Sequence, residues 1–253
     1  MAKNSLQSYI EYRANFYASI TMEIVFLFSK LIYLFFAFGV GDEIGGITPD
    51  QMLFFTGTYT IMVAIYTGLF MDNFYGISGL IGSGMLDVYI TKPVSLLFLV
   101  SLRHVNYALP IPNLVAGVAM IVIGWIRNEI PVDLLHIGGY LLLLISSTVV
   151  MYSVLLIPQI LCFWTIKTGS VTELLDKSWD LNNMPMYIYK KWFQRLGIFL
   201  IPILFITNMP ANFLVDRMSM AYWIWVLIAP GIFLAVLKIL WNVAINKYSS
   251  ASS

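Results

Sequence analysis

Six apolar runs, each about as long as a helix that crosses a bilayer, dominate the sequence and limit what it can fold into. Hydrophobic residues make up 60% of the 253 residues and charged residues only 11%, against about 25% charged residues in soluble domains. A crossing helix needs about 20 apolar residues, so the sequence predicts an all-α integral membrane protein. We expect one transmembrane domain over residues 1–253, with six transmembrane helices at about 21–40, 52–71, 105–125, 134–164, 196–215 and 222–241.

Basic residues flank the ends of these runs unequally, which predicts the orientation of the chain. Only Arg127 and Arg217 fall on one side of the spans, whereas the other side holds Lys3, Arg13, Lys92, Arg103, Lys167, Lys177, Lys190, Lys191, Arg195, Lys238 and Lys247. We therefore expect both termini and the polar segments 72–104 and 165–195 to be cytoplasmic. The segment Leu6–Tyr17 mixes charged and aromatic residues, which is typical of an interfacial helix lying along the membrane.

The stretch Gly76–Pro93 is too short and too polar to cross a bilayer, yet it is not an ordinary loop. Its apolar residues recur at helical spacing and form one stripe, which consists of Ile77, Leu80, Ile81, Met85 and Val88. Lys92-Pro93 is expected to end the helix, because proline cannot continue one. The pattern predicts a short amphipathic helix between spans two and three that lies on the membrane face and receives a partner.

The sequence carries few signals for chemistry. It contains no Gly-x4-Gly-Lys-Ser/Thr phosphate-binding loop, so we expect no nucleotide to bind this chain. His104 and His136 fall near opposite ends of the spans and no Cys/His cluster occurs, so neither a metal site nor a catalytic site is predicted. A net charge of +1 makes nucleic acid an unsuitable partner, and the single Cys162 cannot form an intrachain disulfide.

Two charged residues fall within or near the first span. Glu23 and Lys30 are seven residues apart and so share one helix face. Each costs about 2.5–3.5 kcal/mol at the centre of a membrane helix if it is unpaired. This face is expected to line a polar pathway or a contact with another subunit. The alternative is local pairing, or a position of Glu23 among the lipid headgroups.

Pro202, Asn208 and Pro210 interrupt the fifth span. Proline inside a helix removes a hydrogen bond and introduces a kink, and the residue before a proline avoids helical geometry. The pattern favours a broken helix or a re-entrant turn that neighbouring helices shield from lipid. A kinked but otherwise ordinary span is the alternative. We predict that these three residues lie on a pathway or at a subunit interface.

Two parts of the sequence together resemble a known family of membrane proteins. The loop after the second span reads Gly84-x-Leu86-Asp87-x4-Lys92-Pro93 and is similar to a signature of ABC-2 type transporter permeases. Further along, the sequence resembles the daunorubicin/viologen-exporter-like branch of that family, in the order Met184-Pro185-x3-Tyr189, Ile201-Pro202 and Asn208-x-Pro210. The resemblance extends over essentially the whole chain.

The resemblance implies the permease subunit of an ATP-driven exporter in a bacterial cytoplasmic membrane. Such a subunit pairs with a second permease, identical or paralogous, above a cytosolic ABC ATPase dimer that binds ATP and Mg²⁺. The expected cargo is hydrophobic or amphipathic. The resemblance implies a coupling helix around Gly76–Tyr89 and a second cytoplasmic contact with the ATPase. The implied coupling residues are Ile81, Gly84, Leu86, Asp87, Lys92, Pro93, Glu173 and Asp176.

Two other functions fit parts of the sequence. Glu173, Asp176 and Asp180 would share one face of a helix, and a membrane-embedded enzyme acting on lipid-linked substrates could use such an acidic face. An immunity or sensor protein that binds a toxic peptide without ATP-driven transport would also have six spans and little soluble mass. It would not bind an ATPase.

Overall fold

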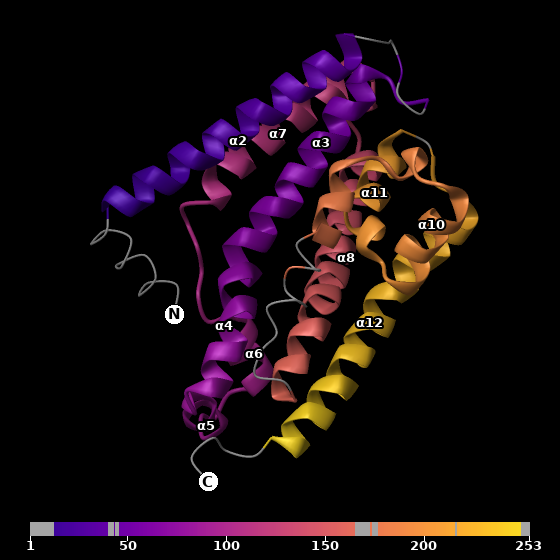
Figure 1. Cartoon of the computed structure of the whole chain (residues 1–253). Coiled ribbons are helices and arrows are strands. Elements are labelled where there is room, and N and C mark those ends of the chain that lie inside the picture. Colours follow the sequence, from indigo (N-terminus) through magenta and orange to yellow (C-terminus); the bar gives the residue numbers. More distant parts are fainter. Residues whose placement is uncertain are drawn as a thin grey trace.

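The computed structural model describes residues 13–39, 43, 46–164, 173, 177–215 and 217–248, and only the backbone at 13, 33, 34 and 36–39. This part of the chain is built from helices arranged side by side (Figure 1). The α-helices are α2 (Arg13–Gly39), α3 (Pro49–Ile65), α4 (Met71–Gly82), α5 (Met85–Ile90), α6 (Leu96–Leu102), α7 (Pro110–Arg127), α8 (Leu134–Gln159), α10 (Lys191–Arg195), α11 (Ile203–Leu214) and α12 (Met220–Lys247). Short π and 3-10 helices join them, namely η1 (Tyr66–Phe70), η2 (Ile160–Phe163), η3 (Asp180–Asn183), η4 (Met186–Ile188) and η5 (Leu196–Leu200).

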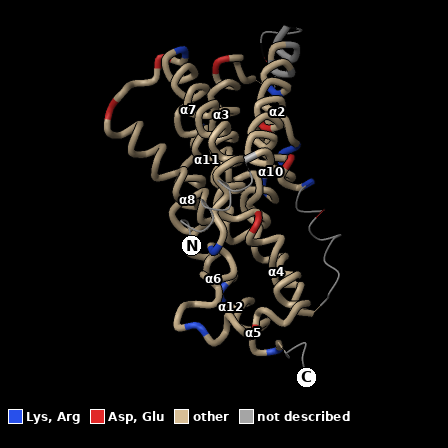
Figure 2. Tube along the Cα trace, turned by 90° about the vertical axis from the view of Figure 1, so that its left-hand side faces the viewer, with Lys and Arg blue, Asp and Glu red and all other residues tan. Residues whose placement is uncertain are grey.

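The predicted all-α membrane fold is confirmed. Within the described residues, five helices are long and apolar enough to cross a membrane, and a bent helix pair raises the number to six if it is one span. The five lie at Ala14–Ile32, Pro49–Gly82, Pro110–Arg127, Leu134–Phe163 and Met220–Lys247. Charged residues gather at the ends of the long helices, with a further group beside α2 (Figure 2).

The helix of the second span is longer than the sequence predicts. α3, η1 and α4 form one 34-residue helical segment, Pro49–Gly82. It begins at a capping box, in which Thr48 Oγ1 accepts from the Gln51 N–H at 3.3 Å and Gln51 Oε1 accepts from the Thr48 N–H at 3.4 Å. These bonds satisfy N–H groups that the first turn leaves unpaired. At its other end the segment reaches Gly82, beyond the predicted end at residue 71.

The prediction of one amphipathic helix over Gly76–Pro93 is wrong. The first part belongs to α4, and a break at Ser83-Gly84 separates it from α5. Gly84 has φ +70°, a left-handed conformation that glycine adopts without strain. Ile77 is fully buried while Met85 and Val88 are exposed, so the predicted stripe is divided between two helices. The predicted stop is confirmed, since α5 ends at Ile90, just before Lys92-Pro93.

The third span begins at Pro110, five residues after its predicted start at Val105. The linker that precedes it is bonded to η1 and α4 instead of continuing the helix. The Asn73 side chain donates to the His104 carbonyl at 2.8 Å and accepts from the His104 N–H at 2.9 Å. Asn106 N–H donates to the Gly68 carbonyl at 2.9 Å. Pro110 then occupies the first turn of α7, where proline is favoured.

Glycine allows α3 and α7 to pack closely. A Cβ atom at Gly57 would lie 2.9 Å from the Ile121 backbone nitrogen, and one at Gly117 would lie 2.8 Å from Ile61 Cγ1. At Gly124 the nearest atom, Phe54 Cβ, would be 2.9 Å away. Small residues at such contacts let helix backbones approach, and close packing supports association inside a membrane.

The fifth span is broken, as one of the two alternatives predicts. The segments Lys191–Leu200 and Ile203–Leu214 meet at 101°, the angle of a broken span or a re-entrant loop. The break falls at Ile201-Pro202. The predicted interruption at Asn208–Pro210 is wrong, because α11 continues through both residues. Asn208 is buried there and its side chain accepts from the Met186 N–H at 2.8 Å and donates to the Leu204 carbonyl at 2.9 Å.

The prediction that 165–195 is a cytoplasmic loop is wrong for its described part, which packs along the helices. Trp179 stacks on Tyr66, with ring centroids 5.1 Å apart. Further along, the Tyr187 hydroxyl lies 3.5 Å from the Arg217 carbonyl, at the end of the molecule opposite α5. Trp179, Tyr187 and Tyr189 of this segment are half-buried against helices, whereas Trp192 is exposed. Because Tyr187 lies at the end opposite α5, the basic residues Lys190, Lys191 and Arg195 no longer count toward the side that carries α5.

The predicted interfacial helix Leu6–Tyr17 is described only in part. Residues 6–12 lie outside the described residues. Residues 13–17 belong to the same helix, α2, as the first span, so no break separates a surface helix from the span within this range.

We predict that Gly57→Ala lowers the melting temperature of the purified protein. The new methyl group would meet the Ile121 backbone, and such overpacking typically costs about 1–3 kcal/mol. Thermal unfolding in detergent, followed by tryptophan fluorescence, measures the change. Gly231→Ala is the matched control, because no atom lies within 4 Å of the added Cβ. Equal melting temperatures for the two variants would contradict the close packing of α3 and α7.

Candidate functional site

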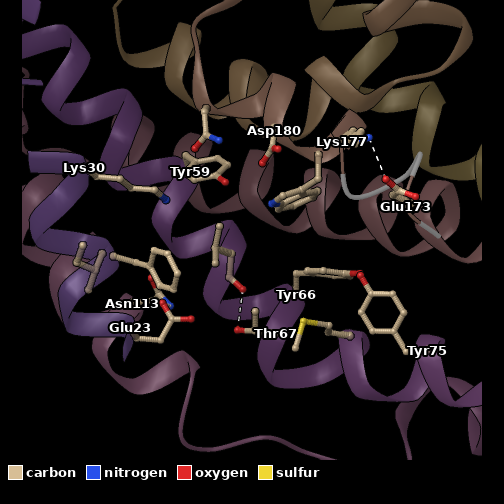
Figure 3. A pocket seen from close by; sticks show the side chains of 16 residues that line it. Glu23, Lys30, Tyr59, Tyr66, Thr67, Tyr75, Asn113, Glu173, Lys177 and Asp180 are labelled. Carbon is tan, nitrogen blue, oxygen red and sulfur yellow. Dashed lines mark hydrogen bonds and ion pairs between the residues drawn. The ribbon is translucent and has the colours of Figure 1, made fainter. Parts of the chain in front are cut away.

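A cavity of about 480 Å³ lies between α2, α3, α4, α7 and the described residues of the 173–183 segment. Its walls carry both charged and aromatic side chains, which point toward one another from separate helices (Figure 3). The charged residues are Glu23, Lys30, Glu173, Lys177 and Asp180, and the aromatic residues are Phe26, Tyr59, Tyr66, Tyr75 and Trp179. This charged cavity lies among the helices that are long and apolar enough to cross a membrane.

Glu23 enters the charged cavity from α2 and is held by α7. Asn113, which is almost fully buried, donates to Glu23 Oε2 at 3.1 Å and to the Leu109 carbonyl at 2.9 Å. A carboxylate among apolar helices is costly unless it accepts hydrogen bonds, and this amide supplies one. This contact is the local pairing that one alternative for Glu23 predicts.

Lys30 enters the same cavity two turns further along α2, as the seven-residue spacing predicts. Its Nζ lies 4.1 Å from the centroid of the Tyr59 ring, a cation–π contact that stabilises a charge away from water. Glu23 and Asp180 are the carboxylates that act on it electrostatically. Lys30 is therefore surrounded by an aromatic face and negative charge contributed by three different parts of the chain.

The acidic residues predicted on one cytoplasmic face are placed differently. Glu173 and Asp180 line the charged cavity, and Glu173 Oε1 lies 2.9 Å from Lys177 Nζ. Asp176 lies outside the described residues. Within the ranges that the structure describes, no group of three or more His, Cys, Asp and Glu residues is arranged to hold a metal ion. Glu173 thus belongs to the cavity rather than to the end of the molecule that carries α5.

A second cavity, of about 340 Å³, adjoins the first along α3. It is lined by Ser29, Met52, Thr56 and Met184, and it shares Lys30, Tyr59 and Asn183 with the charged cavity. The two cavities together follow α3 and α4 from Tyr75 to Met52. The three shared residues stand where the cavities meet. Pro202, Asn208 and Pro210, predicted to lie on a pathway, line neither of these two cavities.

At one end of the molecule, α5 presents a surface of its own. Leu86 is fully buried, and Ile81 and Tyr89 pack partly against the same cluster. Met85 and Val88 are exposed, and so are Lys92 and Pro93 after the helix. The Arg103 guanidinium lies 4.9 Å from the Tyr89 ring, which joins α5 to the linker after α6. The inner face of α5 is packed on the buried cluster, and its outer face is exposed.

No sequence pattern singles out Tyr59, Asn113 or Trp179 as members of the cavity. Aromatic and asparagine residues occur throughout the apolar runs, so composition does not distinguish these three. The available signal is indirect, because a charge inside a membrane helix requires polar or aromatic neighbours. Glu23 and Lys30 therefore indicate that a polar site exists without identifying its other walls.

The comparison with known families identifies the class of protein. The family model of the ABC-2 family transporter proteins matches residues 24–252, nearly the whole chain. The chain belongs to the ABC-2 transporter family. Neither a curated protein nor a solved structure matches the chain significantly. The daunorubicin/viologen-exporter-like branch stays a prediction.

Membership of this family has direct consequences. The chain is a multi-pass membrane protein and a transport subunit rather than a catalytic enzyme. The family implies that it works as the permease of an ABC transporter, in contact with lipid and with an ABC ATPase.

We predict that the charged cavity is accessible to water. In a Cys162→Ala background, which removes the single cysteine, Phe26→Cys should react with a charged methanethiosulfonate reagent about tenfold faster than Phe28→Cys, because only the thiolate formed in water reacts. Phe26 lines the cavity and Phe28 does not, although their exposed fractions are 61% and 62%. Reaction rates measured in proteoliposomes test this. Equal rates would show that lipid or protein fills the cavity.

Proposed function

We propose that this chain is the permease subunit of an ATP-driven exporter that moves a hydrophobic or amphipathic substrate out of the cytoplasm or the inner leaflet. A separate cytosolic ATPase dimer binds ATP and Mg²⁺, and this chain binds no nucleotide. A second permease subunit, identical or paralogous, completes the transmembrane unit. The complex resides in a bacterial cytoplasmic membrane with both termini of this chain on the cytoplasmic side.

The arrangement of α5 carries this proposal. It is a six-residue helix at one end of the molecule, with Leu86 buried beneath it and apolar side chains exposed on its outer face. An exposed apolar surface rimmed by charge is typical of a docking site for another protein. Lys92, Arg103 and Lys247 lie at this end of the chain's helices, which supports a cytoplasmic position under the positive-inside rule.

The helical segment that borders the charged cavity ends next to the docking surface, where the turn at Ser83-Gly84 joins α4 to α5. Helix α4 begins at η1 and ends beside α5, and its residues Met71 and Tyr75 line the cavity together with Tyr59 and Tyr66 further up the segment. Helices are stiff along their axes, so a displacement of α5 by the ATPase shifts the wall of the cavity. This is how ATP hydrolysis in another chain reaches the substrate.

The two cavities supply a route for an amphipathic substrate. The charged cavity offers ionised groups and aromatic faces, whereas the adjoining cavity is lined by Met52, Met184 and other uncharged residues beyond Lys30. A substrate with a polar and an apolar end can satisfy both linings at once. The residues shared by the two cavities, Lys30, Tyr59 and Asn183, would have to separate for a substrate to pass from one to the other.

Contacts at the end opposite α5 would close the exit for a substrate. The Arg217 guanidinium lies 5.0 Å from the Tyr187 ring and donates to the Gly46 carbonyl. Arg127 Nη1 lies 3.2 Å from Asp50 Oδ1. These contacts tie the start of α3 to α7 and to the linker before α12. Release of a substrate on this side requires them to separate.

We predict that reversing two charges at the docking surface uncouples the permease from its ATPase. The double variant Asp87→Lys/Lys92→Asp keeps the net charge but removes the charge pattern that the ATPase would contact. We expect co-purification of the ATPase to fall about tenfold, which corresponds to about 1.4 kcal/mol, and transport to fall with it. Membrane insertion should be unaffected.

A matched control reverses an exposed ion pair at the other end of the molecule, Asp50→Arg/Arg127→Asp. It should retain the ATPase. Undiminished co-purification and transport in Asp87→Lys/Lys92→Asp would contradict the proposed docking site. A wild-type protein that retains no ABC ATPase would instead favour the peptide-immunity or sensor alternative.

A further inference from the structure

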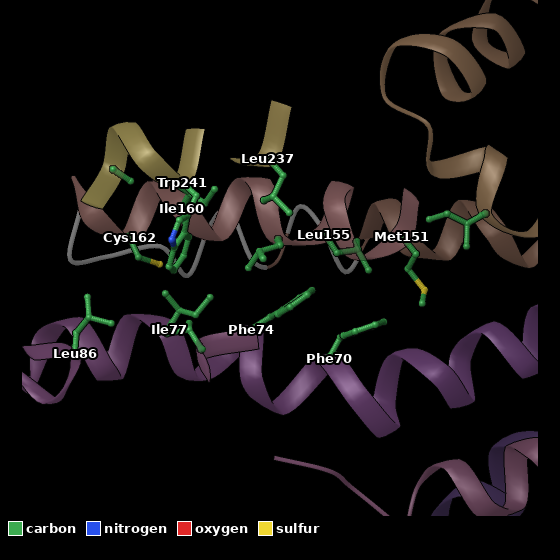
Figure 4. Packing of buried hydrophobic residues seen from close by; sticks show 14 of the residues in the cluster. Phe70, Phe74, Ile77, Leu86, Met151, Leu155, Ile160, Cys162, Leu237 and Trp241 are labelled. Carbon is green, nitrogen blue, oxygen red and sulfur yellow. The ribbon is translucent and has the colours of Figure 1, made fainter. Parts of the chain in front are cut away.

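The inner face of α5 joins a buried cluster that other helices share. Leu86 belongs to this cluster, which also contains Ile77 of α4, Cys162 of η2 and Trp241 of α12 (Figure 4). Leu86 and Ile77 are fully buried, and Cys162 and Trp241 are almost so. The short helix packs on α4 and α6, and the shared cluster links it to the segment that follows α8 and to the last turns of α12.

Three aromatic side chains join η2 to the end of α12. The rings of Phe163 and Trp241 have centroids 5.5 Å apart at 85°, and those of Phe163 and Tyr248 are 5.9 Å apart at 86°. Both are edge-to-face pairs, which are worth about 0.5–1.5 kcal/mol each beyond the area that they bury. We call these three residues the aromatic triad. It fixes the end of α12 against the end of α8.

Tyr248 also reaches α5 through its polar end. Its oxygen is shielded from solvent, and no atom of the described residues stands in hydrogen-bond geometry to it. The Asp87 carboxylate is nonetheless close enough that it adds to burial in raising the pKa of the Tyr248 phenol. Asp87 therefore faces the end of α12, as Leu86 does.

We infer that Trp241 and Tyr248 are positioning residues for α5. When the ATPase displaces α5, these two residues make α8 and α12 move together with α5. This inference rests on the proposed function, in which α5 is the docking element. Without the aromatic triad, a displacement of α5 would reach the membrane only through its direct neighbours α4 and α6. With it, the displacement is shared by helices on both sides of the buried cluster.

Spin-label distances in the complete permease–ATPase complex test this inference. In a Cys162→Ala background, labels are placed at the exposed Val243 of α12 and Val118 of α7, and their separation is measured with and without ATP and vanadate. We expect a change in the wild type. We expect that change to fall by about half in Tyr248→Ala, because only one of two contiguous routes remains. The ATPase should stay bound, since the outer face of α5 is intact.

Two further variants make the result specific. Tyr222→Ala removes a tyrosine from the other end of the same helix, and it should leave the distance change as in the wild type. Tyr248→Phe keeps the ring and removes the hydroxyl, so it should have a smaller effect than Tyr248→Ala while the ATPase stays bound. This milder change also serves if Tyr248→Ala fails to fold.

The outcomes separate this inference from the proposed function. A wild-type label distance that changes with ATP, together with the same change in Tyr248→Ala and retained ATPase, would overturn the positioning role alone. A wild-type complex that holds no ATPase would overturn both the proposed function and this inference.

Discussion

The 34-residue helical segment Pro49–Gly82 is the element on which the rest of the structure depends. Backbone groups inside a membrane must bond to one another, because no water is present to replace them, so a crossing segment keeps its helix even where its geometry must change. The segment packs on α7 through glycine, borders both cavities along its length and ends beside α5. The proposed docking surface at one end and the cavity among the transmembrane helices are therefore joined by one helical segment.

The two charges that α2 brings into the charged cavity each have a neighbour that offsets their desolvation. Glu23 accepts from Asn113 and Lys30 lies over Tyr59, whereas the Glu173–Lys177 pair is largely exposed. A buried charge without such a neighbour is costly. The groups that line the cavity are also drawn from elements far apart in sequence, so the cavity exists only when α2, α7 and the 173–183 segment are assembled. Polar groups that stabilise the packing in this way are the same groups that a substrate would meet.

The sequence predicts the features that depend on local composition and misses those that depend on packing. Apolar runs predict the spans because the bilayer sets a minimum length, and proline correctly predicts the end of α5 and the break at Pro202. The segment 165–195 looks like a polar loop, yet its Trp179 stacks on Tyr66 of η1 and its Tyr187 packs against Arg217. Glu23 and Lys30 fall in one cavity as their spacing predicts, whereas Asn113 and Tyr59 become their partners only through tertiary contacts. Gly84 breaks a periodic pattern that would otherwise continue from one helix into the next.

The π-helical turn at Tyr66–Phe70 has a consequence for how the two halves of the long segment face their neighbours. A π turn holds one residue more than an α turn, and one residue in an α-helix corresponds to a rotation of about 100°. α3 above the turn packs against α7, while α4 below it packs against α8 and η2. The extra residue rotates α4 about the helix axis relative to α3, so that α4 faces a different partner. Deleting it would rotate α4 relative to α3 and carry Ile77 away from the cluster on which Leu86 rests, so a one-residue change at mid-membrane would alter the surface that α5 presents.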